Sequence, residues 1–116
     1  MNISDLVGTP YKVHGRDESG LDCFGLIWLI AMRLGRPIRD PVYKGFNCSL
    51  IRLAEYVGLK QCDFEIGCVV EIEKDERLHL GYAIDDTRMI HCALNEGVII
   101  EDIDNYKVNG YWKFKD

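Results

Sequence analysis

The chain has 116 residues, a formal net charge of -5 and a pI of about 5.1. Hydrophobic residues make up 47% and charged residues 28% of it, which is typical of a globular protein rather than a disordered one. The length suits a single domain over residues 1–116. The negative balance argues against nucleic acid or an anionic membrane surface as the main partner, because few cations are present to neutralise phosphates.

The cysteines and the first residues bear on where the protein is made. Five cysteines, at positions 23, 48, 62, 68 and 92, are an odd number with irregular spacing, unlike the disulfide framework of a small secreted domain. The opening "MNISDLVGTPY" is too polar for a signal peptide. The apolar run 20–35 is too short to span a membrane and contains Arg33. We therefore expect synthesis in a reducing cytoplasm, with the final location left open.

The N-terminal half is predicted to be helical. Residues 3–8 suggest a short helix, and the polar, glycine-containing residues 12–21 suggest a loop. The next helix is predicted from Cys23 to Leu34, with Asp22 as its N-cap and a stop at Gly35. It is apolar nearly all round, so we expect it to be the buried, central helix.

A second helix is predicted from Ser49 to Val57, and strand patterns follow it. The strands are expected at 68–72, 78–84, 88–93, 98–103 and 110–114. Helices followed by a meander of strands predict an α+β fold, in which an antiparallel sheet of about five strands packs on the central helix.

Cys23 is the first candidate for chemistry, because it would occupy the first turn of the central helix. Unpaired N–H groups there carry partial positive charge, which stabilises a thiolate and lowers the pKa of the thiol. The same groups could bind an oxyanion beside the sulfur. The alternative is a buried cysteine that only fills space above the core.

His79 and His91 lie on neighbouring strands of a predicted hairpin whose turn is centred near residue 85. They should therefore be roughly opposite each other and share a sheet face. Gly81 and Ala83 on that face would let the end of the central helix approach. Cys23 would then meet His79, with His91 behind it, which is the order of nucleophile, base and orienting group that acyl transfer by a thiol requires. The alternative is two half-exposed histidines without a role.

Four short motifs in order resemble the NlpC-type cell-wall cysteine peptidases, a circular permutation of the papain-like fold. They are "GTPYKVHG", "DCFGL", "HLGYAID" and "MIHCALNEGVII", and together they span about residues 5–103. The resemblance implies that Cys23 is the nucleophile, His79 the general base and His91 the residue that orients it. It also implies that Tyr11 and Asp22 lie beside the substrate. His14, in the loop before Cys23, is either a substrate contact or a solvated loop residue.

Phe24 stands where a serine usually follows the nucleophile, and this resembles the phage-tail branch of the family. The aromatic side chain would alter the substrate pocket rather than the chemistry. The resemblance implies a thiol hydrolase that cleaves the D-glutamyl–diamino acid bond of peptidoglycan stem peptides, without a cofactor. Partners would be the peptidoglycan peptide and, in a virion, phage tail proteins.

Two other interpretations stay open: a non-catalytic tail component of the same fold, or a thiol hydrolase acting on a non-wall peptide or acyl substrate. A metal site is not expected, because the cysteines and histidines lack the close pairs of a zinc site. Arg16, Asp17 and Glu18 suggest a solvated cluster near the predicted cleft.

Overall fold

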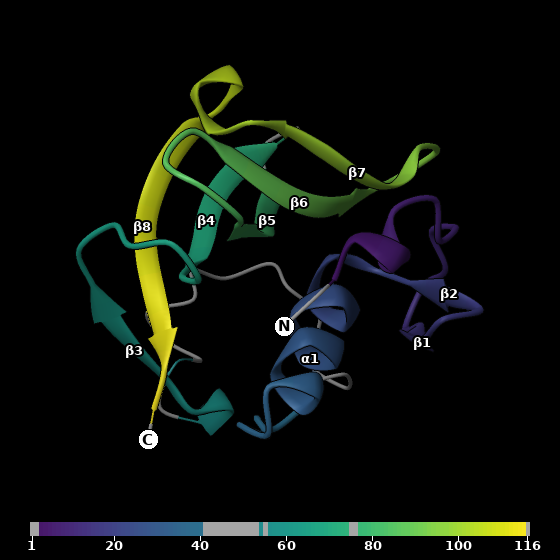
Figure 1. The fold of residues 1–116 in the computed structure, drawn as a ribbon, viewed down its shortest axis with the longest axis horizontal. Coiled ribbons are helices and arrows are strands. Elements are labelled where there is room, and N and C mark those ends of the chain that lie inside the picture. Colours follow the sequence, from purple (N-terminus) through teal and green to yellow (C-terminus); the bar gives the residue numbers. More distant parts are fainter. Residues whose placement is uncertain (1–2, 41–53, 55, 75–76, 116) are drawn as a thin grey trace.

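The computed structural model describes residues 3–40, 54, 56–74 and 77–115. In these residues the helix α1 (Cys23–Arg33) lies against a six-stranded antiparallel sheet, and a two-stranded hairpin precedes the helix (Figure 1). This confirms the α+β class and the helix-on-sheet arrangement, with one strand more than expected. No helix in the described residues is both long and apolar enough to cross a membrane.

The six-stranded sheet has the order β3-β8-β4-β5-β6-β7, and β1 and β2 form the hairpin. It curves strongly from β8 through β4 and β5 to β6 and β7 (Figure 1). A bulge between Glu71 and Ile72 in the β4–β8 pair contributes to this bend. The elements are η1 (Ser4–Leu6), β1 (Arg16–Asp17), β2 (Gly20–Leu21), β3 (Leu59–Cys62), β4 (Val69–Lys74), β5 (Arg77–Ala83), β6 (Arg88–Ala93), β7 (Gly97–Asp102), η2 (Ile103–Asn105) and β8 (Lys107–Phe114).

Helix α1 begins and ends as its sequence predicts. The Asp22 carboxylate accepts a hydrogen bond from the Gly25 N–H at 2.7 Å, which caps the first turn. Gly35 follows the last turn in the left-handed region, with φ of +72°. The helix buries Phe24, Leu26, Ile27, Ile30 and Ala31, so its apolar stripe faces the sheet.

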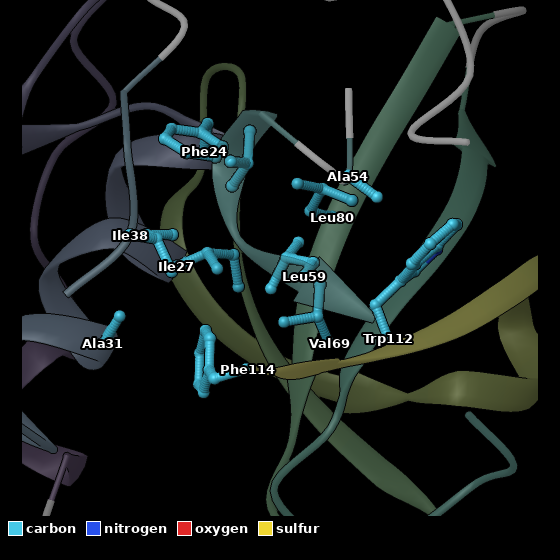
Figure 2. Packing of buried hydrophobic residues seen from close by; sticks show 11 residues of the cluster. Phe24, Ile27, Ala31, Ile38, Ala54, Leu59, Val69, Leu80, Trp112 and Phe114 are labelled. Atoms are coloured by element: carbon cyan, nitrogen blue, oxygen red, sulfur yellow. The ribbon is translucent and has the colours of Figure 1, made fainter. Parts of the chain in front are cut away.

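The two faces of the sheet have separate cores. One face packs on the helix, and Figure 2 shows Phe24 and Ile27 in one cluster with strand residues that include Leu59 and Leu80. The opposite face packs against itself inside the curve of the sheet and is closed by η2. Its buried members are Cys68, Val70, Ile72, Ala83, Met89 and Ile103. The sheet is therefore buried on both sides around β4 and β5.

The β5–β6 hairpin turns one residue later than predicted. The Ile84 N–H donates to the Arg88 carbonyl at 3.0 Å, and the Asp85 carboxylate accepts from the backbone N–H groups of Thr87 and Arg88. The loop is thus residues 85–87, and His91 pairs with Gly81 rather than with His79. The change of partner is two residues, so both histidines stay on one face.

Two other expectations need correction, and one strand was not predicted. The predicted loop 12–21 contains the β1–β2 hairpin, which polar residues disguise. Residues 3–8 form a single 3₁₀ turn, and β3 was not predicted because "LKQC" has no apolar alternation. Most of the predicted helix 49–57 lies outside the described residues, and residues 54, 56 and 57 are helical.

Candidate active site

Cys23 is the first residue of α1, as predicted, and its side chain is partly exposed. Hydrogen bonding from the backbone of Leu80 and Phe24 acts on the sulfur and favours the thiolate. The contact with Leu80 joins the start of the helix to β5, one residue after His79. Cys23 therefore lies at the junction of helix and sheet rather than within either core.

The electrostatic setting of Cys23 differs from the sequence prediction. Burial of the thiol, and then the negative charge of Asp22, raise its pKa to about 11, against the hydrogen bonds from Leu80 and Phe24 and the charge of Arg16. The N-terminus of the helix was predicted to lower this pKa, and its contribution is outweighed by loss of solvent. Cys23 is therefore a neutral thiol near pH 7.

The sulfur lies where β5 and β6 separate. The ladder between these strands joins Gly81 to His91, Tyr82 to Ile90 and Ala83 to Met89. In the described residues, β5 continues in the other direction along β4 alone, and the helix start contacts the β5 backbone at Leu80. On the β6 side, the Cys92 thiol donates to the Leu21 carbonyl at 3.0 Å, which fixes the residue two before Cys23.

The sequence predicted that the end of the helix would approach the sheet face that carries the histidines. In the structure the helix does not approach that face. It packs on the face that carries Leu80, whereas His79 alternates to the other face. The space beside Gly81 is filled by Met89, whose Sδ would lie 2.5 Å from an added Cβ. The helix tip reaches the strand edge instead, because the strands diverge there.

His79 and His91 meet as the sequence predicted, although diagonally. Nε2 of His79 lies 2.8 Å from Nδ1 of His91, and the ring planes are nearly perpendicular at 86°. His79 is 8% exposed and His91 is fully buried. This arrangement leaves Nδ1 as the ring nitrogen of His79 that His91 does not occupy.

Both imidazoles are held neutral by their surroundings. Burial, followed by repulsion from His91 and Lys74, lowers the pKa of His79 to about 3. Burial also lowers the pKa of His91, although its hydrogen bond to Glu101 opposes this. The pair is therefore uncharged near neutrality, which is the state in which an imidazole can accept a proton.

Glu101 on β7 extends the chain of contacts, and sequence reasoning missed it. Its Oε1 lies 2.8 Å from His91 Nε2 and accepts from the Tyr106 hydroxyl at 2.9 Å. Its Oε2 accepts from the Asn105 amide at 3.3 Å. The available signal was that β7 pairs with β6, since an acid on a neighbouring strand can face a histidine. The β6–β7 register places Glu101 diagonally from His91, two residues beyond its partner Ile99.

Asp22 anchors the loops in front of the helix. Besides capping α1, its carboxylate pairs with Arg16 Nη1 at 2.8 Å and accepts from the backbone N–H of His14 at 2.9 Å. Arg16 also binds Asp40 at 2.6 Å, so it is a structural link rather than a solvated residue. Gly25 makes this possible, because a Cβ there would collide with the Gly15 carbonyl and lie 2.9 Å from Arg16 Nη1.

The remaining predicted site residues are divided. Tyr11 forms a parallel bridge with Leu21, which brings it beside the segment that leads into Cys23. His14 is exposed, and its role toward a substrate stays a prediction. Phe24 is wholly buried in the core between α1 and the sheet. The Arg16 guanidinium lies 5.4 Å from the centroid of the Phe24 ring. The Phe24 side chain packs the core and lies beside Arg16 of the hairpin, so its burial does not support the predicted contact with substrate, which stays a prediction.

One cavity borders a predicted site residue. A cavity of about 410 Å³ borders Tyr11 and is otherwise lined by residues 94–97 with Gly8 and Pro10. In the described part of the chain, no three His, Cys, Asp or Glu side chains are grouped so that they could hold a metal ion.

The chain is similar in sequence to a known protein over most of its own length. The chain is 33% identical over 109 residues to the probable peptidoglycan endopeptidase LytE of Bacillus subtilis (strain 168), a match that covers 93% of this chain and 29% of LytE. The chain thus spans less than a third of that relative. No family model matches the chain.

Solved structures show the same fold. The NlpC/p60 domain of the peptidoglycan hydrolase SagA has a TM-score of 0.63 and 19% identity, covering 94% of this chain and 89% of that one. NlpC2 from Trichomonas vaginalis has a TM-score of 0.70 and 19% identity, covering 95% and 43%. The α+β fold of this chain, with one helix on an antiparallel sheet, is therefore the papain-like fold of these neighbours. The chain is thus similar in sequence to a probable peptidoglycan endopeptidase and similar in fold to an NlpC/p60 domain.

Proposed function

We propose that this domain is a cysteine hydrolase that cleaves an amide bond in peptidoglycan stem peptides. The observation that carries the proposal is the hydrogen bond to the Cys23 sulfur, at the start of α1, from the backbone of Leu80, the residue that follows His79 of the hydrogen-bonded His79–His91 pair. Similarity to LytE, whose name gives peptidoglycan as its substrate, supports the substrate class. The bond between D-glutamate and the diamino acid is the proposed specificity.

The protonation states define how the reaction would begin. Cys23 is a thiol and His79 a neutral imidazole near pH 7, so the nucleophile forms by proton transfer during attack. Nδ1 of His79 accepts the thiol proton as the sulfur bonds to the carbonyl carbon. His79 then gives that proton to the departing amine as the C–N bond breaks. Water, deprotonated by His79, hydrolyses the thioester and regenerates the thiol.

The first turn of α1 supplies the donor for the oxyanion. The Gly25 N–H is occupied by the Asp22 carboxylate and the Leu26 N–H by the Asp22 carbonyl. Hydrogen bonding from Phe24 acts on the sulfur. The proposed oxyanion donor is therefore the Cys23 N–H, assisted by Tyr11.

Defined muropeptides and mass spectrometry test the proposal. The purified protein is expected to release a new amine at the diamino acid, whereas Cys23→Ala should release none. Cys62→Ala is the matched control, because Cys62 lies on β3; it should cleave normally. Equal product from wild type and Cys23→Ala would contradict a thiol mechanism. Absence of cleavage by the wild type would favour a structural role, and cleavage only of a non-wall peptide would change the substrate class.

Association with a phage tail stays a prediction based on the phenylalanine at position 24. The side chain of Phe24 helps to fill the core, so its aromatic character serves packing in this structure. A location in the virion rests on the same residue and is proposed with it. Detection of the protein in purified particles by mass spectrometry would test both.

A further inference from the structure

We propose that Glu101 is a positioning residue which, acting through His91, selects the tautomer of His79 that can accept the thiol proton. The inference rests on the proposed function, because it concerns the base in that reaction. It is carried by one continuous chain of contacts: His79 Nε2 to His91 Nδ1 at 2.8 Å, and His91 Nε2 to Glu101 Oε1 at 2.8 Å.

The series of hydrogen bonds starts at the carboxylate of Glu101. Burial works to raise the pKa of Glu101, but hydrogen bonds from Tyr106, His91 and Asn105 together hold it below its usual value. Glu101 is therefore ionised near neutrality and can only accept hydrogen bonds. The atom that faces it, His91 Nε2, must then carry a proton, because two lone pairs at 2.8 Å would repel each other.

The proton on His91 Nε2 determines which ring nitrogen of His79 carries a proton. His91 is kept neutral by burial, so its Nδ1 has a lone pair and accepts from His79. His79 must donate through Nε2, which leaves its Nδ1 unprotonated and free to act as the base. The opposite tautomers would place the lone pair of His91 Nε2 against the carboxylate. A doubly protonated His91 would likewise leave the proton of His79 on Nδ1, where it blocks catalysis.

The fold holds Glu101 in place from the other side. The 3₁₀ turn η2 follows β7 and brings Asn105 and Tyr106 back onto the carboxylate, at 3.3 Å and 2.9 Å. The Tyr106 ring also lies edge-on to His91, with centroids 5.7 Å apart. Glu101 is 25% exposed whereas His91 is fully buried, so the chain of hydrogen bonds runs from the surface into the interior.

Long-range ¹H–¹⁵N NMR of histidine-labelled protein reads each tautomer directly and does not depend on activity. In the wild type we expect the proton on Nε2 of both His79 and His91. Glu101→Ala should produce mixed or reversed tautomers. If the domain cleaves muropeptides, Glu101→Ala should also lower kcat by roughly 10- to 100-fold with little change in KM, the range found when a metal-bound histidine loses its hydrogen-bond partner.

Two further variants separate positioning from mere support. Glu101→Gln keeps an acceptor oxygen and should preserve the tautomers and most of kcat. Asp102→Asn removes the next, exposed carboxylate on β7 and should change neither. A proton on His79 Nδ1 in the wild type, or unchanged tautomers in Glu101→Ala, would overturn the inference. A protein with the expected tautomers that cleaves no muropeptide would instead contradict the proposed function and leave the role of Glu101 standing.

Discussion

The two halves of the candidate site are built differently. The sulfur half is a helix start held by exposed loops and charged pairs, with Asp22, Arg16 and Asp40 linked around the first turn. The imidazole half is a row of hydrogen bonds on the sheet face opposite Leu80, which runs from the partly exposed Glu101 to the buried His91 and His79. Burial shifts the pKa of Cys23 up to about 11 and that of His79 down to about 3, so this thiol and this imidazole are both neutral near pH 7. A helix N-terminus alone therefore does not make an activated thiolate.

The largest expected effect is on activity and comes from replacing His79, the proposed base in the imidazole half. His79→Asn removes the proton acceptor while leaving Cys23 and α1 in place, so muropeptide cleavage should fall about 10³-fold. Thermal unfolding and far-UV circular dichroism should show that the variant folds. Cleavage within a few-fold of wild type would show that another group takes the proton. Cys62→Ala, on β3, is the control and should keep full activity.

Acid stability tests the burial of the histidines. Unfolded His79 takes up a proton near pH 6.5, whereas the folded one does so only near pH 3. The unfolded state therefore binds more protons between these values, and the free energy of unfolding falls as the pH falls through this window. The loss by pH 4 should be on the order of 3 kcal/mol. Urea unfolding from pH 7 to pH 4 measures it.

The same titration in two variants assigns the effect. His79→Asn should have a clearly flatter pH dependence, and His14→Asn should follow the wild type. A wild-type stability that does not change between pH 7 and pH 4 would mean that His79 is not buried as a neutral group.

The next test disturbs the close packing between the first turn of α1 and the loop in front of it. Gly25→Ala places a methyl group against the Gly15 carbonyl and beside Arg16, so the loop must move away from the helix. We expect a loss of about 2 kcal/mol in the free energy of unfolding. Gly35→Ala is the comparison, because a Cβ there has nothing within 4 Å and only its φ of +72° is strained, at a cost of about 1 kcal/mol. An equal loss in both variants would contradict the close approach at Gly25.

The smallest effect concerns the charge beside the sulfur. Asp22 raises the pKa of Cys23, and asparagine caps helices about as well as aspartate. In Asp22→Asn the pH midpoint of iodoacetamide alkylation at Cys23 should therefore fall by about 1 pH unit or less. Asp40→Asn removes a charge from the same network without that effect. Rapid alkylation of the wild type at pH 7 would show that the helix start outweighs burial.

The sequence predicted the parts of the site that depend on local pattern. Asp22 and Gly35 bounded the helix, and residues 88–93 were predicted with their observed limits. His79 and His91 shared a face because alternation fixes parity, even though the turn at Asp85 changed their partner by two residues.

What the sequence did not predict depends on long-range arrangement. The face that the helix covers is decided by how the whole sheet curves and by Met89 filling the space beside Gly81. The contact between Glu101 and His91 needs the register of a second hairpin. The raised pKa of Cys23 depends on burial by segments distant in the sequence, which no local motif encodes.

The position of β8 has a consequence for how the chain acquires its shape. This strand lies between β3 and β4, which precede it in the sequence by more than thirty residues. Neither neighbour can complete its ladder until β8 arrives. During translation the β4–β7 meander can assemble early, whereas the side of the sheet that contains β3 must wait for synthesis to pass Phe114. Such non-local pairing is slow, so a ribosome that stalls before β8 would present an incomplete sheet with an open edge.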